Sequence, residues 1–409
     1  MVLWSPDESL KNSANITRFM ADLRKRHGVP LETHGDLFDW SIREPDLFWR
    51  SVLESCAIQY SGDAAAVLED RHRMPGARWF PGIRLNFARN LLRFSDDRPA
   101  VVSWGEDLRR EVVTFGELQS KVSKLQAFLR TAGLKPGDNV AAFVPNIPDT
   151  IVAMLATTSL GASWSSCSPD FGVSGVLDRF AQVEPKILFC ADGYFFKGAK
   201  IDSLGRVRQV LGELKSVART VVMPFISEKP DLRGVPNGES LVDIYNTSGD
   251  TPLSFPEFPF AHPLYIMFSS GTTGKPKCIV HSAGGTLLEH LKELILHTNL
   301  KQQDRIFYQT TCGWMMWNWL VSSLAVGVTV VLYDGSPLQR GSKILFDLAQ
   351  DEKVTIFGTN AKFIALCEKE GLRPIESHDL SSLHTILSTG SPLLPENFEY
   401  VYSSIKKNV

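Results

Sequence analysis

The sequence has 409 residues, of which 44% are hydrophobic, and its formal charge of −2 comes from 43 basic and 45 acidic side chains. This length and composition are typical of a globular protein with two or three structural units. A nearly neutral chain has no net field that would attract nucleic acid or an anionic membrane. The N-terminal stretch MVLWSPDESLKNSANITRFM lacks the apolar core of a secretory signal, and no apolar run is long enough to span a membrane. We therefore expect a cytoplasmic, cytosolic protein without nucleic-acid or membrane partners.

Six cysteines lie far apart in the sequence, and no two have the C-x-x-C spacing of a zinc site or a redox dithiol. Such cysteines are typical of cytosolic proteins, so we expect reduced, buried thiols. The residues are Cys56, Cys167, Cys190, Cys278, Cys312 and Cys367.

The region from Thr114 to Ser166 alternates between helix and strand patterns. Thr114 and Glu117 have the spacing of a capping box, and the apolar periodicity that follows predicts a helix that ends at Gly133. LKPGDNVAAFVP predicts a turn and a strand, and IPDTIVAMLATTSLG predicts a second helix that ends at Gly161 before the apolar ASW.

The same alternation returns in the last third of the sequence. Helices are predicted near Ile344–Gln350 and over Ala361–Gly371, and PENFEYVYSSIKK predicts one more crossover helix. The predicted strands are VTVVLY (328–333), VTIFGT (354–359) and LHTILS (383–388). Alternating strands and helices predict an α/β fold with parallel βαβ sheets. Because the chain stops at Val409, where the next strand should begin, we expect the fold to be incomplete.

The stretch MFSSGTTGKPKCIVHS (267–282) has the composition of an anion-binding loop. YIMF (265–268) and CIVHS (278–282) predict strands on both sides of it. Glycines allow the backbone N–H groups to converge on one point, hydroxyls add donors, and two lysines add charge. We predict phosphate binding by Ser269, Ser270, Gly271, Thr272, Thr273, Gly274, Lys275 and Lys277.

Known phosphate loops of other classes do not fit this stretch. Only two residues separate Gly271 from Gly274, and Pro276 follows Lys275 where a Walker A loop has Ser or Thr for magnesium. The sequence also lacks G-x-G-x-x-G at this position. On composition alone, a flexible hairpin turn remains an alternative.

SSGTTGKPK resembles the signature phosphate loop of the ANL superfamily, which comprises acyl-CoA synthetases, carrier-loading adenylation domains and luciferases. DWSIREPDLFWR and RWFPGIRLNFARNLL resemble the N-terminal region of its acetyl-CoA synthetase branch. SPDFGVSGVLDRF, GWMMWNW and LHTILSTGSPL are similar to the members that activate acetoacetate, and the resemblance runs from about Leu3 to Lys406. It implies an adenylate-forming large N-terminal domain, with an acyl-CoA synthetase N-terminal region over 1–95 and a truncated AMP-binding domain over 96–409.

The resemblance implies two half-reactions. A carboxylate, acetoacetate, attacks the α-phosphorus of ATP bound with Mg²⁺ to form an acyl-adenylate and pyrophosphate, and the CoA thiol then takes the acyl group. Thr272 and Lys275 would be the catalytic residues of the loop. An acetyl- or propionyl-CoA synthetase and a non-catalytic nucleotide-binding remnant remain alternatives, and the sequence leaves the oligomeric state open.

The resemblance also implies an adenine-binding turn and an acyl pocket. Gly390, Ser391 and Pro392 would meet the adenine through backbone contacts, because acetyl-CoA synthetases have G-E-P where this chain has G-S-P; an ordinary βα turn is the alternative. Trp314, Met315 and Met316 would line the acyl pocket. For GWMMWNW, a buried core stripe is the alternative.

CoA needs basic residues beside a glycine turn, and Gly172, Lys197 and Lys200 match that region of the family weakly. The alternative for the two lysines is a solvated basic loop. No metal-ligand spacing accompanies His281 or His384, which we expect to be structural. Family chains continue into a ribose-binding aspartate, a hinge and a lid domain with a catalytic lysine. Because this C-terminal lid domain is absent, we expect the chain alone to be inactive.

Overall fold

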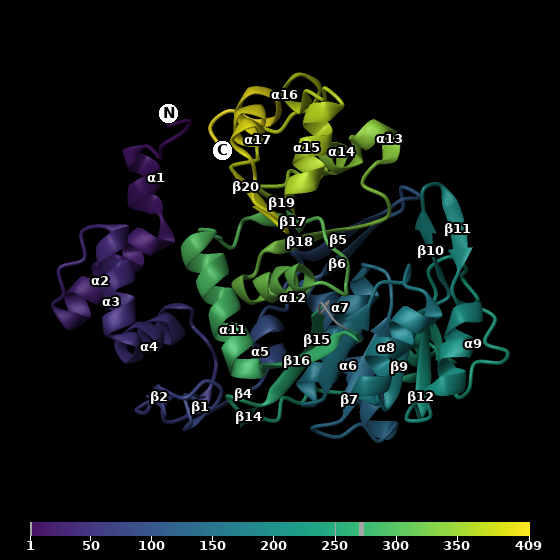
Figure 1. Ribbon diagram of the computed structural model, residues 1–409. Helices are drawn as coiled ribbons and strands as arrows, with labels where there is room; N and C mark the ends of the chain where they lie inside the picture. The colour runs from purple at the N-terminus through teal and green to yellow at the C-terminus, as the bar shows by residue number, and fades with distance from the viewer. Residues whose placement is uncertain (1, 250, 270–273) are drawn as a thin grey trace.

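The computed structural model describes residues 2–249, 251–269 and 274–409. Within these ranges two large sheets form the centre of the molecule, and helices surround them (Figure 1). The helices α1 (Glu8–Ser13), α2 (Asn15–His27), α3 (His34–Arg43) and α4 (Pro45–Ser55) lie at the opposite end from the β10–β11 hairpin (Gly193–Phe196 and Ala199–Asp202). In the described part of the chain, no helix combines the length and the apolar character that crossing a membrane requires.

The first sheet has seven strands among the described residues. Its order is β13 (Gly238–Ser240), β12 (Arg219–Met223), β9 (Ile187–Ala191), β7 (Asn139–Phe143), β8 (Ser163–Cys167), β15 (Pro263–Ser269) and β16 (Lys277–Ser282). The pairs from β13 to β15 are parallel, and only β16 pairs antiparallel, with β15. The strands predicted at 265–268 and 278–282, which flank the predicted phosphate loop, are thus confirmed.

The second sheet has six strands in the same described ranges. Its order is β20 (Thr385–Thr389), β19 (Ile356–Asn360), β17 (Arg305–Tyr308), β18 (Thr329–Asp334), β5 (Pro99–Gly105) and β6 (Arg110–Thr114). All pairs are parallel except β5 with β6. The predicted parallel α/β fold is therefore confirmed for the sheet interiors, whereas each sheet has one antiparallel edge strand that the sequence analysis did not predict.

Three small sheets account for the other strands of the described residues. They comprise β1 (Ser61–Gly62), β4 (Ile83–Leu85) and β14 (Phe258–Pro259); β2 (Leu68–Glu69) and β3 (Arg78–Trp79); and the β10–β11 hairpin.

The remaining helices cover the sheets and connect their strands. In chain order they are α5 (Phe87–Leu91), α6 (Phe115–Thr131), α7 (Pro148–Ser159), α8 (Val173–Val183), α9 (Leu204–Glu213), α10 (Leu241–Thr247), α11 (Ala283–Leu291), α12 (Met315–Ser322), α13 (Gln339–Ser342), α14 (Ile344–Asp351), α15 (Ala361–Lys369), α16 (Pro374–Ser377) and α17 (Pro395–Tyr400). α11 and α17 continue as the π-helical turns η1 (Lys292–His297) and η3 (Val401–Ile405), and α12 continues as the 3₁₀ turn η2 (Ser323–Val326).

Local sequence signals explain several of these boundaries. Thr114 and Glu117 form the predicted capping box at the start of α6, and Gly133 after it has a φ of +79°. Gly161 follows α7 with a φ of +76°, as the predicted end of that helix requires. An added Cβ at Gly161 would also meet the Phe258 ring at 2.3 Å, so both backbone and packing require glycine there.

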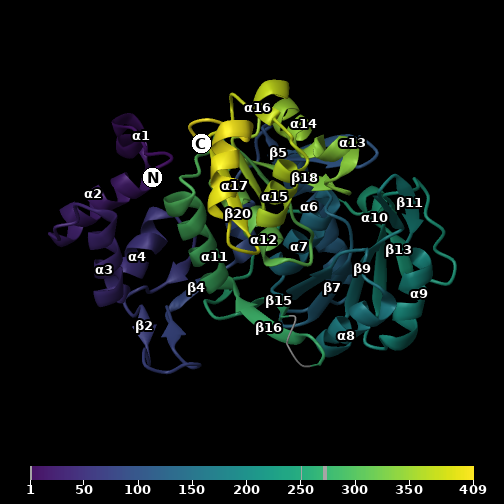
Figure 2. The same cartoon turned by 45° about the horizontal axis from the view of Figure 1, so that its top comes forward.

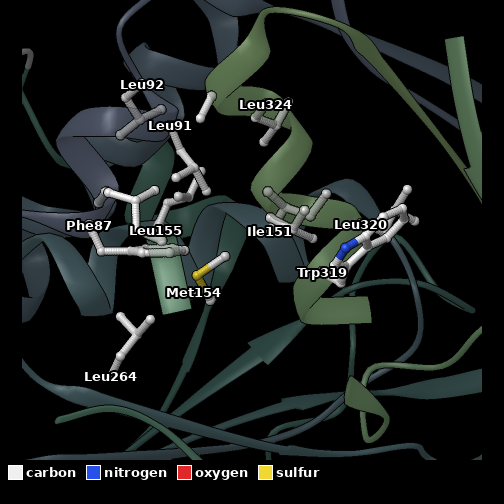
Figure 3. Packing of buried hydrophobic residues seen from close by; sticks show 14 of the residues in the cluster. Phe87, Leu91, Leu92, Ile151, Met154, Leu155, Leu264, Trp319, Leu320 and Leu324 are labelled. Carbon is white, nitrogen blue, oxygen red and sulfur yellow. The ribbon is translucent and has the colours of Figure 1, made fainter. Parts of the chain in front are cut away.

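The central core fixes the position of α12. Figure 3 shows side chains of α5, α7 and α12 packed together, with Phe87, Ile151, Met154 and Leu320 among them. These residues are buried, and they continue the core between the two sheets. Because its inner face is anchored in this way, α12 presents its N-terminal residues at a defined place.

Five of the six cysteines are buried, as predicted, but Cys278 is exposed. Cys278 lies on the edge strand β16, which pairs on one side only, with β15. The prediction of a buried thiol was therefore wrong for this residue, because the sequence did not reveal that its strand is an edge.

Candidate functional site

The phosphate-loop segment joins two paired strand ends. Ser269 lies opposite Lys277 in the antiparallel register, and Gly274 has a φ of +104° that side chains rarely adopt. Ser270, Gly271, Thr272 and Thr273 lie outside the described residues. The structure thus places the two ends of the loop side by side.

Helix α8 holds the C-terminal end of this segment. Figure 2 shows α8 beside β16, and Gln182 Nε2 donates a hydrogen bond to the Pro276 carbonyl at 2.9 Å. Lys275 Nζ lies 4.0 Å from Asp178 Oδ1, and its side chain is 74% exposed. The Lys275 ammonium is therefore only loosely paired and is accessible to an anion.

The predicted adenine turn follows β20. Gly390 has a φ of +92°, and Gly390, Ser391 and Pro392 lie directly after Thr389, the last residue of the strand. Thr389 pairs with Asn360 at the end of the parallel strand β19. This is the carboxyl edge of a parallel sheet, where α/β folds bind ligands.

A cavity of about 820 Å³ lies between α11, α12 and the ends of β15, β16 and β20. Met315 and Met316 line it, as predicted for an acyl pocket, together with Ser388 and Thr389 next to the adenine turn. Trp314, predicted for the same pocket, is not among the lining residues of this cavity and is 67% exposed. The cavity connects the methionine pair to the turn after β20.

Different residues of GWMMWNW fit the two interpretations that the sequence left open, a buried core stripe and a pocket lining. Trp317 is fully buried, and its Nε1 donates to Asn146 Oδ1 at 3.0 Å. Trp319 is also buried, although its edge reaches the cavity wall. Trp317 thus behaves as a core residue and the two methionines as a cavity lining.

Polar residues along α11 and η1 line the same cavity and were missed by the sequence analysis. They are Thr286, Glu289, His290, Glu293 and His297. Their spacing of three and four residues is the signal that would have placed them on one helical face. His281, which is predicted to be structural, also lines the cavity, and burial lowers its pKa.

The predicted CoA residues belong to two different elements. Gly172 is the N-cap of α8, whereas Lys197 lies in the turn between β10 and β11 and Lys200 on β11. Both lysines are exposed, and Lys197 Nζ lies 5.5 Å from the centre of the Phe196 ring. The solvated-loop alternative therefore remains open for them. Among the described residues, no group of three or more His, Cys, Asp or Glu side chains is arranged to hold a metal ion.

The back of the cavity depends on a close contact between two strands. An added Cβ at Gly358 of β19 would lie 2.1 Å from Cδ2 of Tyr308, whose ring lines the cavity. We expect Gly358→Ala to lower the free energy of unfolding by about 1–3 kcal/mol, because overpacking forces the ring to move. Urea unfolding of this variant and of Gly212→Ala, where an added Cβ meets nothing within 4 Å, tests this. Equal stability of the two variants would contradict it.

Comparisons with known proteins show the family of the chain. The family model "AMP-binding enzyme" matches residues 87–406, and "Acetyl-coenzyme A synthetase N-terminus" matches residues 34–91. The acetoacetyl-coenzyme A synthetase of Rhizobium meliloti (strain 1021) is 49% identical over the full chain, and the acetoacetyl-CoA synthetase of Danio rerio is 45% identical. The solved acetoacetyl-CoA synthetase from Streptomyces lividans superposes with a TM-score of 0.93 at 42% identity over 99% of the chain. In each case the chain spans 62% of the length of the protein it matches.

Proposed function

We propose, from the premise that this chain belongs to the AMP-binding enzyme family, that it is the adenylate-forming part of a ligase that joins acetoacetate to CoA. The observation that carries the proposal is the cavity of about 820 Å³, bounded by the strand that leaves the phosphate loop and by the strand that leads into the adenine turn. An acid in this cavity would have its carboxylate near the nucleotide. We propose residues 1–95 as the N-terminal region, residues 96–409 as the AMP-binding domain, and a cytosolic location.

In the first step a carboxylate oxygen of acetoacetate attacks the α-phosphorus of ATP, and the bond to the bridging oxygen of pyrophosphate breaks. Mg²⁺ would arrive with ATP as part of the substrate, held largely by phosphate oxygens. The loop from Ser269 to Lys277 would surround the β and γ phosphates, with Thr272 and Lys275 as catalytic groups that stabilise the charge developing on pyrophosphate. In the second step the CoA sulfur attacks the acyl carbonyl, and AMP leaves.

The other roles follow from position. The backbone of Gly390, Ser391 and Pro392 would contact the adenine, and Met315 and Met316 would enclose the acyl group. Trp314 would join them in the acyl pocket, although its side chain is exposed in this structure. Gly172, Lys197 and Lys200 would contact the phosphates of CoA.

Acetoacetate-dependent release of pyrophosphate from ATP tests the proposal. It should be measured for this chain and for a chimera continued by the C-terminal part of the Rhizobium meliloti relative. We expect release by the chimera with acetoacetate and weaker release with acetate or propionate. A preference for acetate or propionate would point to the corresponding synthetase. Nucleotide binding without release in either protein would favour a non-catalytic nucleotide-binding protein.

Lys275→Ala is expected to lower kcat/KM for ATP in the active protein by about 10- to 100-fold, because a hydrogen bond to a charged group contributes about 1.5–3 kcal/mol. Its loose pairing with Asp178 means that little folding stability depends on it. Lys25→Ala, an exposed lysine of α2, is the control and should leave kcat/KM unchanged. Equal rates for the two variants would remove Lys275 from the phosphate site.

A further inference from the structure

One buried histidine on the cavity wall has no role in the reaction described above. His290 of α11 is 9% exposed and lines the cavity. Burial, with a smaller contribution from the nearby His281, lowers the pKa of His290 to about 3. The imidazole is therefore neutral at neutral pH, with one ring nitrogen carrying a proton and the other a lone pair.

Ser322 of α12 decides which ring nitrogen of His290 carries the proton. The Ser322 hydroxyl donates its single hydrogen to the Asn318 carbonyl at 3.0 Å, so only its lone pairs remain for His290. His290 Nδ1 lies 2.8 Å from Ser322 Oγ and is therefore the protonated nitrogen, which donates. Nε2 keeps the lone pair, and no group of the described residues donates to it. The cavity wall thus has a hydrogen-bond acceptor at the tip of this ring.

A second acceptor on the same wall also lacks a donor. Asn318 is 3% exposed and lines the cavity, and its Nδ2 contacts the thioether of Met267 at 3.5 Å. Its Oδ1 has no hydrogen-bond partner in the part of the chain that the structure describes. Buried polar groups are normally hydrogen-bonded, so a wall with acceptors and no donors for them needs an explanation. A ligand that brings an N–H or O–H group to this wall would supply the missing donor.

The proposed acid can be given such a donor without a change of size. Acetoacetate ends in a methyl ketone at the opposite end from its carboxylate. Replacing the methyl group by an amino group gives the half-amide of malonic acid, which keeps the oxo group and the number of non-hydrogen atoms. Its amide has two N–H hydrogens where the ketone has only C–H groups.

We propose that the cavity also binds a second class of acid, a short acid that ends in a primary amide, and that His290 Nε2 accepts a hydrogen bond from the amide N–H. This inference rests on the proposed function and extends it to a second substrate. The amide satisfies the lone pair of Nε2, whereas the methyl group of acetoacetate leaves it unpaired. Ser322 is a positioning residue, since it acts through the ring.

Binding of two stable acyl-adenylate analogues of equal size to the 409-residue chain tests this without requiring turnover. Calorimetry would compare the acetoacetyl and malonamoyl derivatives of sulfamoyladenosine, with sulfamoyladenosine as the reference that lacks the acyl group. We expect the unchanged chain to bind both derivatives more tightly than the reference and to prefer the malonamoyl derivative. His290→Leu should reduce that preference by about tenfold, the loss expected for one neutral hydrogen bond. His290→Gln should retain part of the preference, because its amide oxygen can still accept.

Ser322→Ala has a matched control in the next residue. It removes the acceptor that holds the ring proton on Nδ1, so the proton can move to Nε2 and block the lone pair. Ser323 is also buried, and its Oγ donates to the Leu320 carbonyl at 2.6 Å. We expect Ser322→Ala to reduce the preference and Ser323→Ala to leave it unchanged. If His290→Leu does not fold, as judged by circular dichroism, His290→Gln and Ser322→Ala decide the question.

The outcomes separate this inference from the function on which it rests. Equal affinity of the unchanged chain for the two derivatives, or an unchanged preference in the His290 and Ser322 variants, would overturn the inference and leave the proposed function intact. If the unchanged chain binds neither derivative more tightly than sulfamoyladenosine, the proposed function fails and the inference fails with it.

Discussion

Trp317→Ala is expected to lower the free energy of unfolding by about 3–5 kcal/mol, the range for removing a large aromatic side chain from a core. The Trp317 side chain is fully buried, and its Nε1 donates to Asn146 Oδ1, an atom of a residue that is itself 2% exposed. The variant therefore leaves both a cavity and an unpaired buried amide oxygen, which places the loss at the upper end of the range. Urea unfolding followed by circular dichroism measures it.

Trp314→Ala is the matched control, because it removes the same side chain three residues earlier. Trp314 is 67% exposed, so its replacement should change the free energy of unfolding by no more than about 0.5 kcal/mol. Trp317→Phe keeps most of the volume and removes the N–H, and should cost about 1–2 kcal/mol. A larger loss for Trp314→Ala than for Trp317→Ala would mean that α12 packs with the opposite face inward.

These two tryptophans also show where sequence reasoning ends. Strands, helices and caps follow from local patterns, which is why the capping box of Thr114 and Glu117 and the strands on both sides of the phosphate loop were predicted correctly. Within GWMMWNW every position is apolar or aromatic except one, so periodicity cannot say which side chain faces the core. That decision is made by neighbours distant in the sequence, such as Asn146, which accepts from Trp317, and Ile151 of α7, which packs in the same cluster as Leu320 (Figure 3).

Only those parts of the candidate site that belong to a sequence motif could be predicted. The predicted phosphate-loop segment and the turn at Gly390 have distinctive compositions, and the described ends of the segment and the turn adjoin strand ends. His290 and Ser322 have no motif, since they are 32 residues apart and meet only because α11 packs against α12. The exposure of Cys278 and the antiparallel edge strands likewise depend on which strands end the sheets, and no local pattern encodes this.

Glu352→Gln is expected to lower the free energy of unfolding by about 3 kcal/mol at neutral pH, the lower end of the range for breaking a buried ion pair. The Glu352 side chain is 2% exposed at the end of α14. It accepts hydrogen bonds from Trp104 Nε1 at 2.7 Å, from Arg110 Nε at 2.6 Å and from Arg305 at 2.7 Å. These partners lie on β5, β6 and β17, so one carboxylate ties α14 to three strands of the second sheet. Arg110 is half exposed and can turn to water, which limits the loss.

The stability lost in Glu352→Gln should depend on pH, because it arises from the charged Glu352 carboxylate. Burial alone would raise the pKa of Glu352, but the hydrogen bonds and charges of Arg110, Trp104 and Arg305 outweigh it and hold the pKa below its ordinary value of 4.5. The stabilisation is therefore complete above pH 4.5 and is lost as the pH falls through the lower folded-state value. The stability difference between the unchanged chain and Glu352→Gln should shrink in that acid range. Glu376→Gln removes an exposed partner of Arg373 and should cost no more than about 0.5 kcal/mol at any pH. A pH-independent difference for Glu352→Gln would show that shape, and not charge, holds α14 to the sheet.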